Sequence, residues 1–342
     1  MVSKRGMWSL SLGIALFLAL ILAFFWGLLS GPVGFSPQEL YRAFLFLFNP
    51  EGEDTAALIL FEIRLPRLIL AVAVGASLSV SGAAFQGIFR NSLADPYVIG
   101  ASSGAALGAA LAITGGFVLP GPLPPASLCA FAGAMGAVCL AFVIARSVGN
   151  PPPAAALLLA GSALGAFFSA LLSLILVLKD RDLYRVYYWL LGSLNGTSWA
   201  ELPAVLPVMF LGCALVFLGC RPLDLLLQGE EVAGSLGIDV PKTRGFIALG
   251  ASLAAAAAVS AAGIIGFVGL IAPHAVRMIT GPVHRRLLPA AALMGALLLV
   301  LADIGARSLG AVEFPIGIIT ALGGAPFFIY LLARHGRRLG RF

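Results

Sequence analysis

Charged residues are scarce in this sequence. Lysine, arginine, aspartate and glutamate make up 11% of its 342 residues, whereas hydrophobic residues make up 60%. A soluble domain carries about 25% charged residues, so this composition excludes a soluble fold and predicts a polytopic membrane protein. The net charge of +6 is not gathered into a basic tract with interleaved aromatic residues, which argues against a nucleic-acid partner.

Lysine is especially rare, and its distribution excludes a nucleotide site. The three lysines are Lys4, Lys179 and Lys242, and none follows a glycine as a phosphate-binding loop requires. We therefore expect no ATP or Mg²⁺ to be bound by this chain.

Acidic residues and metal ligands are nearly missing from the apolar segments. Only Asp303 and Glu313 lie next to an apolar segment, and each is expected at the outer membrane interface. A transporter driven by an ion gradient usually needs an intramembrane acid, so that alternative is disfavoured. A membrane-embedded enzyme would need a His/Asp/Glu constellation within the spans. The histidines His274, His284 and His335 lie near the expected inner face without such a constellation, so neither a catalytic nor a metal site is predicted.

Ten apolar segments predict an all-α membrane domain that occupies residues 1–342. An even number of spans places both termini on one side. With both termini in the cytoplasm, the inner loops carry fourteen of the twenty-one basic residues, as the positive-inside rule favours. The segments lie at about 8–30, 65–89, 97–114, 126–145, 154–178, 203–219, 245–262, 264–279, 287–303 and 314–333.

Two features stand out on the expected outer face. Arg64, Arg67 and Arg307 lie at helix ends. They are either arginines whose charged ends reach interfacial water or a docking site for carboxylates of a soluble partner. Residues 179–202 are rich in aromatic side chains and predict a short helix at the outer membrane interface.

The longest inner loop, residues 220–244, alternates leucines with charges and is broken by Gly229, Gly234 and Gly237. This pattern predicts two short amphipathic helices. They either form a solvated linker on the lipid or insert into a groove of a cytoplasmic partner.

Several motifs, in order, resemble permeases of the FecCD/BtuC type, which are the membrane subunits of ABC importers for iron–siderophore complexes, haem and cobalamin. The resemblance covers nearly the whole chain after about residue 35. Its motifs are RLPR (64–67), RNSLADP (90–96), YYWLLGSL (187–194), GEEVAGSLGI (229–238), IGFVGLIAPHAVR (265–277), LLLVLADIGAR (297–307) and EFPIGIITALGGAPFFIYLL (313–332).

This resemblance implies ten helices per subunit and a homodimer with the transport pathway between the two copies. It also implies two cytoplasmic ATPase subunits, which bind ATP and Mg²⁺, and a periplasmic or lipid-anchored substrate-binding protein. The expected location is the cytoplasmic (inner) membrane of a bacterium or archaeon, and the expected mechanism is alternating access.

The resemblance also implies roles for individual residues. The binding protein would dock on Arg64, Arg67 and Arg307, and the two coupling helices would fall at about 222–240. A cytoplasmic gate, built from hydroxyl residues in cobalamin-type members, would fall on Pro153, Ala154 and Ala155. The residues expected to couple to the ATPase are Leu226, Gly229, Glu230, Glu231, Ala233, Leu236 and Gly237.

Overall fold

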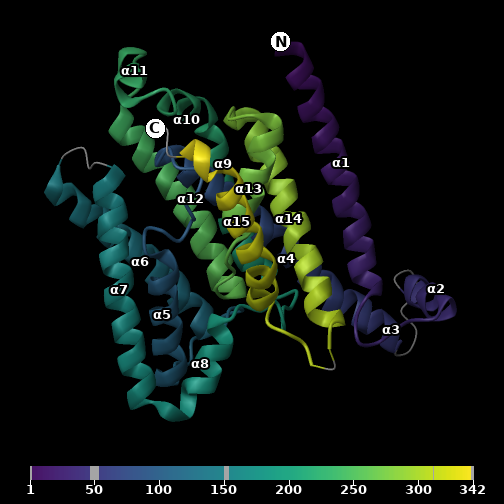
Figure 1. Ribbon diagram of the computed structural model, residues 1–342. Coiled ribbons are helices and arrows are strands. Elements are labelled where there is room, and N and C mark those ends of the chain that lie inside the picture. Colours follow the sequence, from purple (N-terminus) through teal and green to yellow (C-terminus); the bar gives the residue numbers. More distant parts are fainter. Residues whose placement is uncertain (1, 47–53, 150–153, 311, 340–342) are drawn as a thin grey trace.

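The computed structural model describes residues 2–46, 54–149, 154–310 and 312–339 of the chain. Every regular element within these ranges is a helix, which confirms the predicted all-α class (Figure 1). The elements are α1 Val2–Leu29, α2 Pro37–Phe46, α3 Thr55–Ala57, η1 Leu58–Arg64, α4 Leu65–Ile88, α5 Ala101–Gly115, α6 Pro125–Val148, α7 Ala154–Leu178, η2 Asp180–Asp182, α8 Leu183–Leu190, α9 Leu202–Leu218, α10 Cys220–Leu226, α11 Glu230–Ser235, α12 Val240–Ala262, α13 Val268–Thr280, α14 His284–Ser308 and α15 Ile316–Leu339.

Each predicted apolar segment coincides with a helix. Within the described ranges, six helices are long and apolar enough to cross a bilayer, and α9 with α10 forms a seventh span that bends by 52°. Three further apolar helices, α5, α13 and α15, have apolar parts of fewer than 18 residues. The chain is thus a multi-pass membrane protein, whereas a count of ten full crossings stays a prediction.

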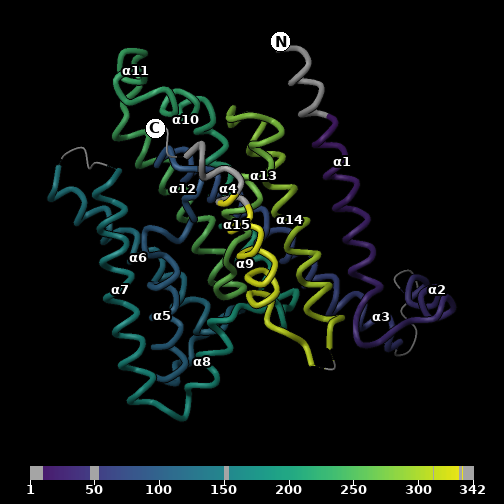
Figure 2. Tube along the Cα trace, in the orientation of Figure 1, coloured from purple at the N-terminus to yellow at the C-terminus, as the bar shows by residue number. Residues whose placement is uncertain are grey.

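Helix α4 forms the centre of the bundle and packs against α14, α12, α13 and α9. Helices α5, α6 and α7 form a group on one side, and α1 lies against α14 on the other (Figures 1 and 2). Helix α1 begins, and α15 ends, toward the end of the bundle that carries α10 and α11 (Figure 1). This arrangement agrees with the prediction that both termini lie on one side, and we call that end the inner end.

Glycines allow α4 to lie unusually close to its neighbours. A Cβ atom added at Gly75 would lie 2.3 Å from the carbonyl oxygen of Gly295 in α14. One added at Gly82 would lie 1.7 Å from the carbonyl oxygen of Gly269 in α13. Small residues at such crossings let backbones pack directly in a membrane, where burial of apolar surface gives no driving force.

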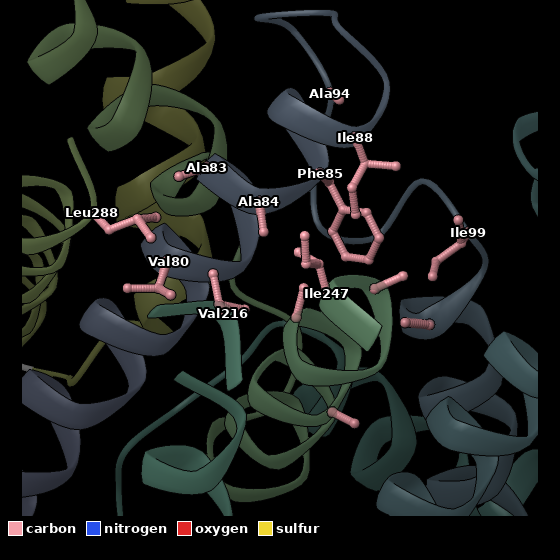
Figure 3. Close-up of a cluster of buried hydrophobic side chains, with 14 of the residues drawn as sticks. Val80, Ala83, Ala84, Phe85, Ile88, Ala94, Ile99, Val216, Ile247 and Leu288 are labelled. Atoms are coloured by element: carbon pink, nitrogen blue, oxygen red, sulfur yellow. The ribbon is translucent and has the colours of Figure 1, made fainter. Parts of the chain in front are cut away.

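Larger side chains fill the spaces between these crossings. Figure 3 shows Phe85 and Ile88 of α4 in one cluster with Ile99, from the α4–α5 connection, and Ile247 of α12. Phe85, Ile99 and Ile247 are each 1% exposed or less, so the cluster holds the inner half of α4 against two other segments.

The predicted outer interfacial segment contains the short helix α8. Its one buried residue is Val186, while Tyr184 and Tyr187 are 73% and 56% exposed. The indole N–H of Trp199 donates a hydrogen bond to the carbonyl oxygen of Phe61, 2.9 Å away. The segment is therefore amphipathic, with aromatic side chains free to lie at the membrane surface.

Candidate functional site

The three arginines singled out from the sequence come together at the outer end of the bundle. Arg64 ends η1, Arg67 lies in the first turn of α4, and Arg307 lies in the last turn of α14. Asp303, one turn before Arg307 and completely buried, lies between two of them. Residues more than 200 positions apart thus share one cluster.

Asp303 is held by two guanidinium groups. Arg67 Nε donates a hydrogen bond of 2.7 Å to Asp303 Oδ1, and Arg307 Nη2 lies 2.9 Å from Asp303 Oδ2. Arg67 also forms an ion pair with Glu313. The buried carboxylate of Asp303 therefore ties the outer end of α4 to that of α14.

Arg64 and Arg307 have a second role that sequence analysis missed, because they cap the outer end of α1. Arg64 Nη1 donates to the carbonyl oxygens of Leu28 and Leu29, at 2.8 Å and 3.0 Å. Arg307 donates to those of Gly27 and Ser30, at 3.1 Å and 3.0 Å. These carbonyls belong to the last turn of α1 and its end, where a helix leaves acceptors unpaired and its dipole favours positive charge.

All three arginines are buried, with only 4–6% of each residue exposed. They do not reach water as interfacial arginines would, and they already contact groups of their own chain. Arg64 differs from the others. Its guanidinium lies 4.7 Å from the ring centre of Phe35, and among the described residues no carboxylate lies within ion-pair distance of it. With three arginines and two carboxylates, the cluster has a net charge of +1, and the docking role of the arginines stays a prediction.

The inner end carries the two short helices predicted for residues 222–240, namely α10 and α11. Helix α10 continues α9 after a 52° bend at Gly219. Gly229, at the start of α11, and Gly237, after its end, have φ values of +120° and +84°, which favour glycine. Gly229 and Gly237 therefore marked both ends of α11, whereas Gly234, also expected to break the loop, lies within the helix.

Of the seven predicted coupling residues, two are buried, Gly229 is half-buried and the other four are exposed. Leu226 and Ala233 are 4% and 0% exposed and pack with Val240 in a small cluster that holds α10, α11 and α12 together. Glu231 and Leu236 project outward, and Leu236 is 60% exposed. The buried residues thus shape the loop, while the exposed ones are accessible to another protein.

One ion pair joins α11 to α12, and a second lies at the start of α12 itself. Glu230 pairs with Arg244 of α12, whose guanidinium is buried. Asp239 accepts a hydrogen bond from the backbone N–H of Lys242 and pairs with its ammonium group at 2.8 Å. The contacts with Lys242 hold the pKa of Asp239 below its usual value. Since this pair is exposed, it contributes little to stability.

The predicted gate lies only partly within the described residues. Pro153 is outside them, while Ala154 and Ala155 form the first turn of α7, half-buried and exposed respectively. Their methyl groups offer no hydrogen bond. The gate assignment stays a prediction.

No group of three or more histidine, cysteine, aspartate or glutamate side chains suited to a metal ion occurs in the part of the chain that the structure describes. The connection between α4 and α5 contains one perturbed acid. Burial raises the pKa of Asp95 to about 6, although the backbone N–H of Tyr97 donates to the carboxylate.

Comparison with known proteins gives a consistent assignment. The profile of the FecCD transport family matches residues 19–334. The cobalamin import system permease BtuC of Halobacterium salinarum is 50% identical over 279 residues, covering 82% of this chain and 74% of that protein. The hemin transport system permease HmuU of Yersinia pestis is 41% identical, covering 95% of this chain and 96% of that protein.

Two further matches are a permease named for an iron chelate and a solved structure. The Fe(3+) dicitrate permease FecD of Escherichia coli is 41% identical, covering 81% of this chain and 85% of that protein. A solved metal-chelate type ABC transporter in an inward-facing conformation is 33% identical. Its TM-score is 0.81, and the match covers 95% of this chain and 99% of the solved one.

Proposed function

Because this chain belongs to the FecCD transport family, we propose that it is the permease subunit of an ATP-driven ABC importer for a chelated metal compound. The observation that carries the proposal is the match of nearly the whole chain, in sequence and in fold, to a metal-chelate type ABC transporter. The cargo is a ferric siderophore, haem or cobalamin, as the names of the relatives suggest. These chelates are substrates and not resident cofactors.

The inner end supports attachment of two ATPase subunits to a dimer of this chain. Val232 and Leu236 of the α11 region are 42% and 60% exposed and stand beside the exposed Glu230 and Glu231. A short helix with an apolar face and acidic neighbours suits insertion into a groove with basic rims. Since α10 is continuous with α9 through one bend, displacement of this loop would be passed directly to a membrane helix.

At the outer end, Arg64 is the best candidate to receive a carboxylate of the binding protein. Arg67 and Arg307 already share Asp303, whereas Arg64 has only carbonyl oxygens and the Phe35 ring as partners among the described residues. Because Arg64 is only 4% exposed, an incoming carboxylate would have to replace one of these carbonyl oxygens, and it would gain a charge-assisted hydrogen bond in exchange. Arg67 and Arg307 would then position the helix ends around the docking point and add to its positive field.

The pathway would run between two copies of the chain and open alternately to each side. Helix α7 supports this arrangement, because only 11% of its most apolar stretch is buried within the protein, against 78% for the corresponding stretch of the helix that contains α4. A membrane helix whose surface is so little covered by its own chain can pack against a second copy of the chain. Ala154 and Ala155, at the inner end of α7, would form part of an apolar constriction.

The test is reconstitution of the permease with its ATPase in vesicles that contain the binding protein at the outer face. Cobalamin, ferric dicitrate and hemin are offered separately. We expect ATP-dependent accumulation of one of them, and none in vesicles that lack the ATPase. Accumulation that persists without the ATPase would refute the proposal and favour an ion-gradient transporter.

A further inference from the structure

The inner ends of three helices meet at a pair of side chains, Asp224 of α10 and His284, the first residue of α14. The backbone N–H of His284 donates a hydrogen bond of 2.7 Å to Asp224 Oδ1, and its ring Nδ1 lies 2.7 Å from the same oxygen. His284 is completely buried, while the Asp224 side chain is 28% exposed. The inner loop at 220–244, which we call the coupling loop, therefore contacts the membrane bundle through this largely buried polar pair, which we call the joint.

Asp224 acts as the N-terminal cap of α14. A helix leaves its first backbone N–H groups without partners, and a nearby carboxylate satisfies them and complements the helix dipole. The residue that precedes α14 is Val283, whose side chain has no oxygen to do this. The cap is instead supplied from 60 residues away, by the helix that leads into the coupling loop.

Helix α4 packs against this pair from a third side. A Cβ atom added at Gly87 would lie 2.8 Å from His284 Nε2 and 3.0 Å from Leu223 Cδ2 of α10. Leu223, next to Asp224 in α10, and Leu287, in the first turn of α14, are completely buried. Any displacement of α10 must therefore move α14 and α4 or break the joint.

Helix α14 leads from this joint to the outer arginine cluster. His284 and Asp303 are 19 residues apart in one helix, about 28 Å at 1.5 Å per residue. Asp303 and Arg307, at the far end, hold the outer ends of α4 and α1. One helix thus connects the proposed ATPase side with the proposed docking side.

We propose that Asp224 and His284 are positioning residues for transport, forming the link through which movement of the coupling loop is passed to α14 and α4. This inference rests on the proposed function, because it presupposes that an ATPase moves the loop. It goes further in naming which contact carries the movement. Without this contact, ATP hydrolysis would continue, but the membrane helices would no longer change conformation in response to it.

The test compares uptake per ATP hydrolysed, a ratio that does not change when only the amount of folded complex falls. The variants are Asp224→Ala, His284→Ala and the double variant, in the full complex with ATPase and binding protein. Asp224→Asn keeps the acceptor oxygen for the cap and serves as the conservative replacement. Asp54→Ala is the matched control, because Asp54 also caps a helix, accepting from the N–H of Ala57, but only within its own segment.

We expect each alanine variant to hydrolyse ATP within about twofold of the unmodified complex and to lose about tenfold in uptake per ATP, which corresponds to ~1.4 kcal/mol. The double variant should lose no more than either single one, because two residues that act as one link are not additive. Asp224→Asn should recover most of the ratio, and Asp54→Ala should leave it unchanged.

Unchanged uptake per ATP in both alanine variants would overturn the inference, as would additive losses in the double variant. Lower yield of a complex whose ratio is normal would show that the pair only stabilises the fold, which also overturns it. If the unmodified complex itself shows no ATP-dependent uptake of cobalamin, ferric dicitrate or hemin, the proposed function fails first. The two failures are therefore distinguishable.

Discussion

Replacing Asp303 by asparagine tests whether this carboxylate stabilises the structure or carries protons. Its side chain is completely buried, with Arg67 Nη2 at 2.7 Å and Arg307 Nη2 at 2.9 Å. Asparagine has nearly the same shape and keeps one acceptor oxygen, so packing is preserved while the charge is lost. Glu313 still faces Arg67, and Arg307 becomes the buried cation without a carboxylate.

Removing one partner of a buried ion pair costs about 3–5 kcal/mol, because the other charge is left uncompensated. Since Glu313 still offsets Arg67, we expect Asp303→Asn to lower the free energy of unfolding by ~3 kcal/mol, at the lower end of that range. Asp180→Asn is the matched control, because Asp180 is exposed on the same face. It should stay within about 0.5 kcal/mol of the unmodified protein.

The assay is denaturant-induced unfolding of the purified protein in detergent micelles, followed by circular dichroism. The double variant Asp303→Asn/Arg307→Gln should lose less than the sum of the two single variants, since it removes the uncompensated charge. A loss below about 1 kcal/mol for Asp303→Asn would refute this reasoning. If such a stable variant also lost transport, Asp303 would become a candidate proton carrier.

Three further predictions concern other parts of the fold. Arg64→Gln should increase the rate of hydrogen exchange at residues 28–33, because the carbonyls of Leu28, Leu29 and Val33 lose a charged partner; an unchanged rate would show that Arg64 does not hold α1. Gly82→Ala should prevent correct folding, measured as loss of monodisperse protein, since its Cβ would lie 1.7 Å from a backbone oxygen. Gly136→Ala, with nothing within 4 Å, should fold normally, and equal yields would contradict the close packing. Because burial raises the pKa of Asp95 to about 6 from 3.8, the unfolded chain ionises first and the contribution of this carboxyl to stability falls as pH rises from 4 through 6. Asp95→Asn should therefore raise the melting temperature more at pH 7.5 than at pH 4.5, and an equal effect at both pH values would argue against a buried acid.

Much of the fold could be predicted from local sequence. Apolar segments predict membrane helices because each backbone polar group in lipid must be paired within its own helix. Gly229 and Gly237 marked the ends of α11, because their positive φ angles are a local requirement. The span count was harder, since α5, α13 and α15 have short apolar parts and composition does not tell whether a short helix crosses the membrane.

The partners of the polar residues could not be predicted in the same way. The sequence placed Arg67 and Asp303 at outer helix ends, but their contact joins positions 236 residues apart. The capping of α1 by Arg64 and Arg307 depends on where that helix ends beside α4 and α14. Asp224 and His284 carry no motif that pairs them, and they meet where α10, after its bend from α9, packs against α14. Such contacts follow from tertiary packing and have no local periodicity.

The proposal that ATP, and not an ion gradient, drives uptake is tested by measuring uptake in reconstituted vesicles from which each energy source is removed in turn. Vesicles with the permease, ATPase and binding protein are loaded with ATP on the ATPase side and treated with ionophores that abolish proton and sodium gradients. We predict that chelate uptake continues unchanged and stops when the ATPase is inhibited with vanadate. Uptake that collapses with the ionophores and persists with vanadate would contradict the account.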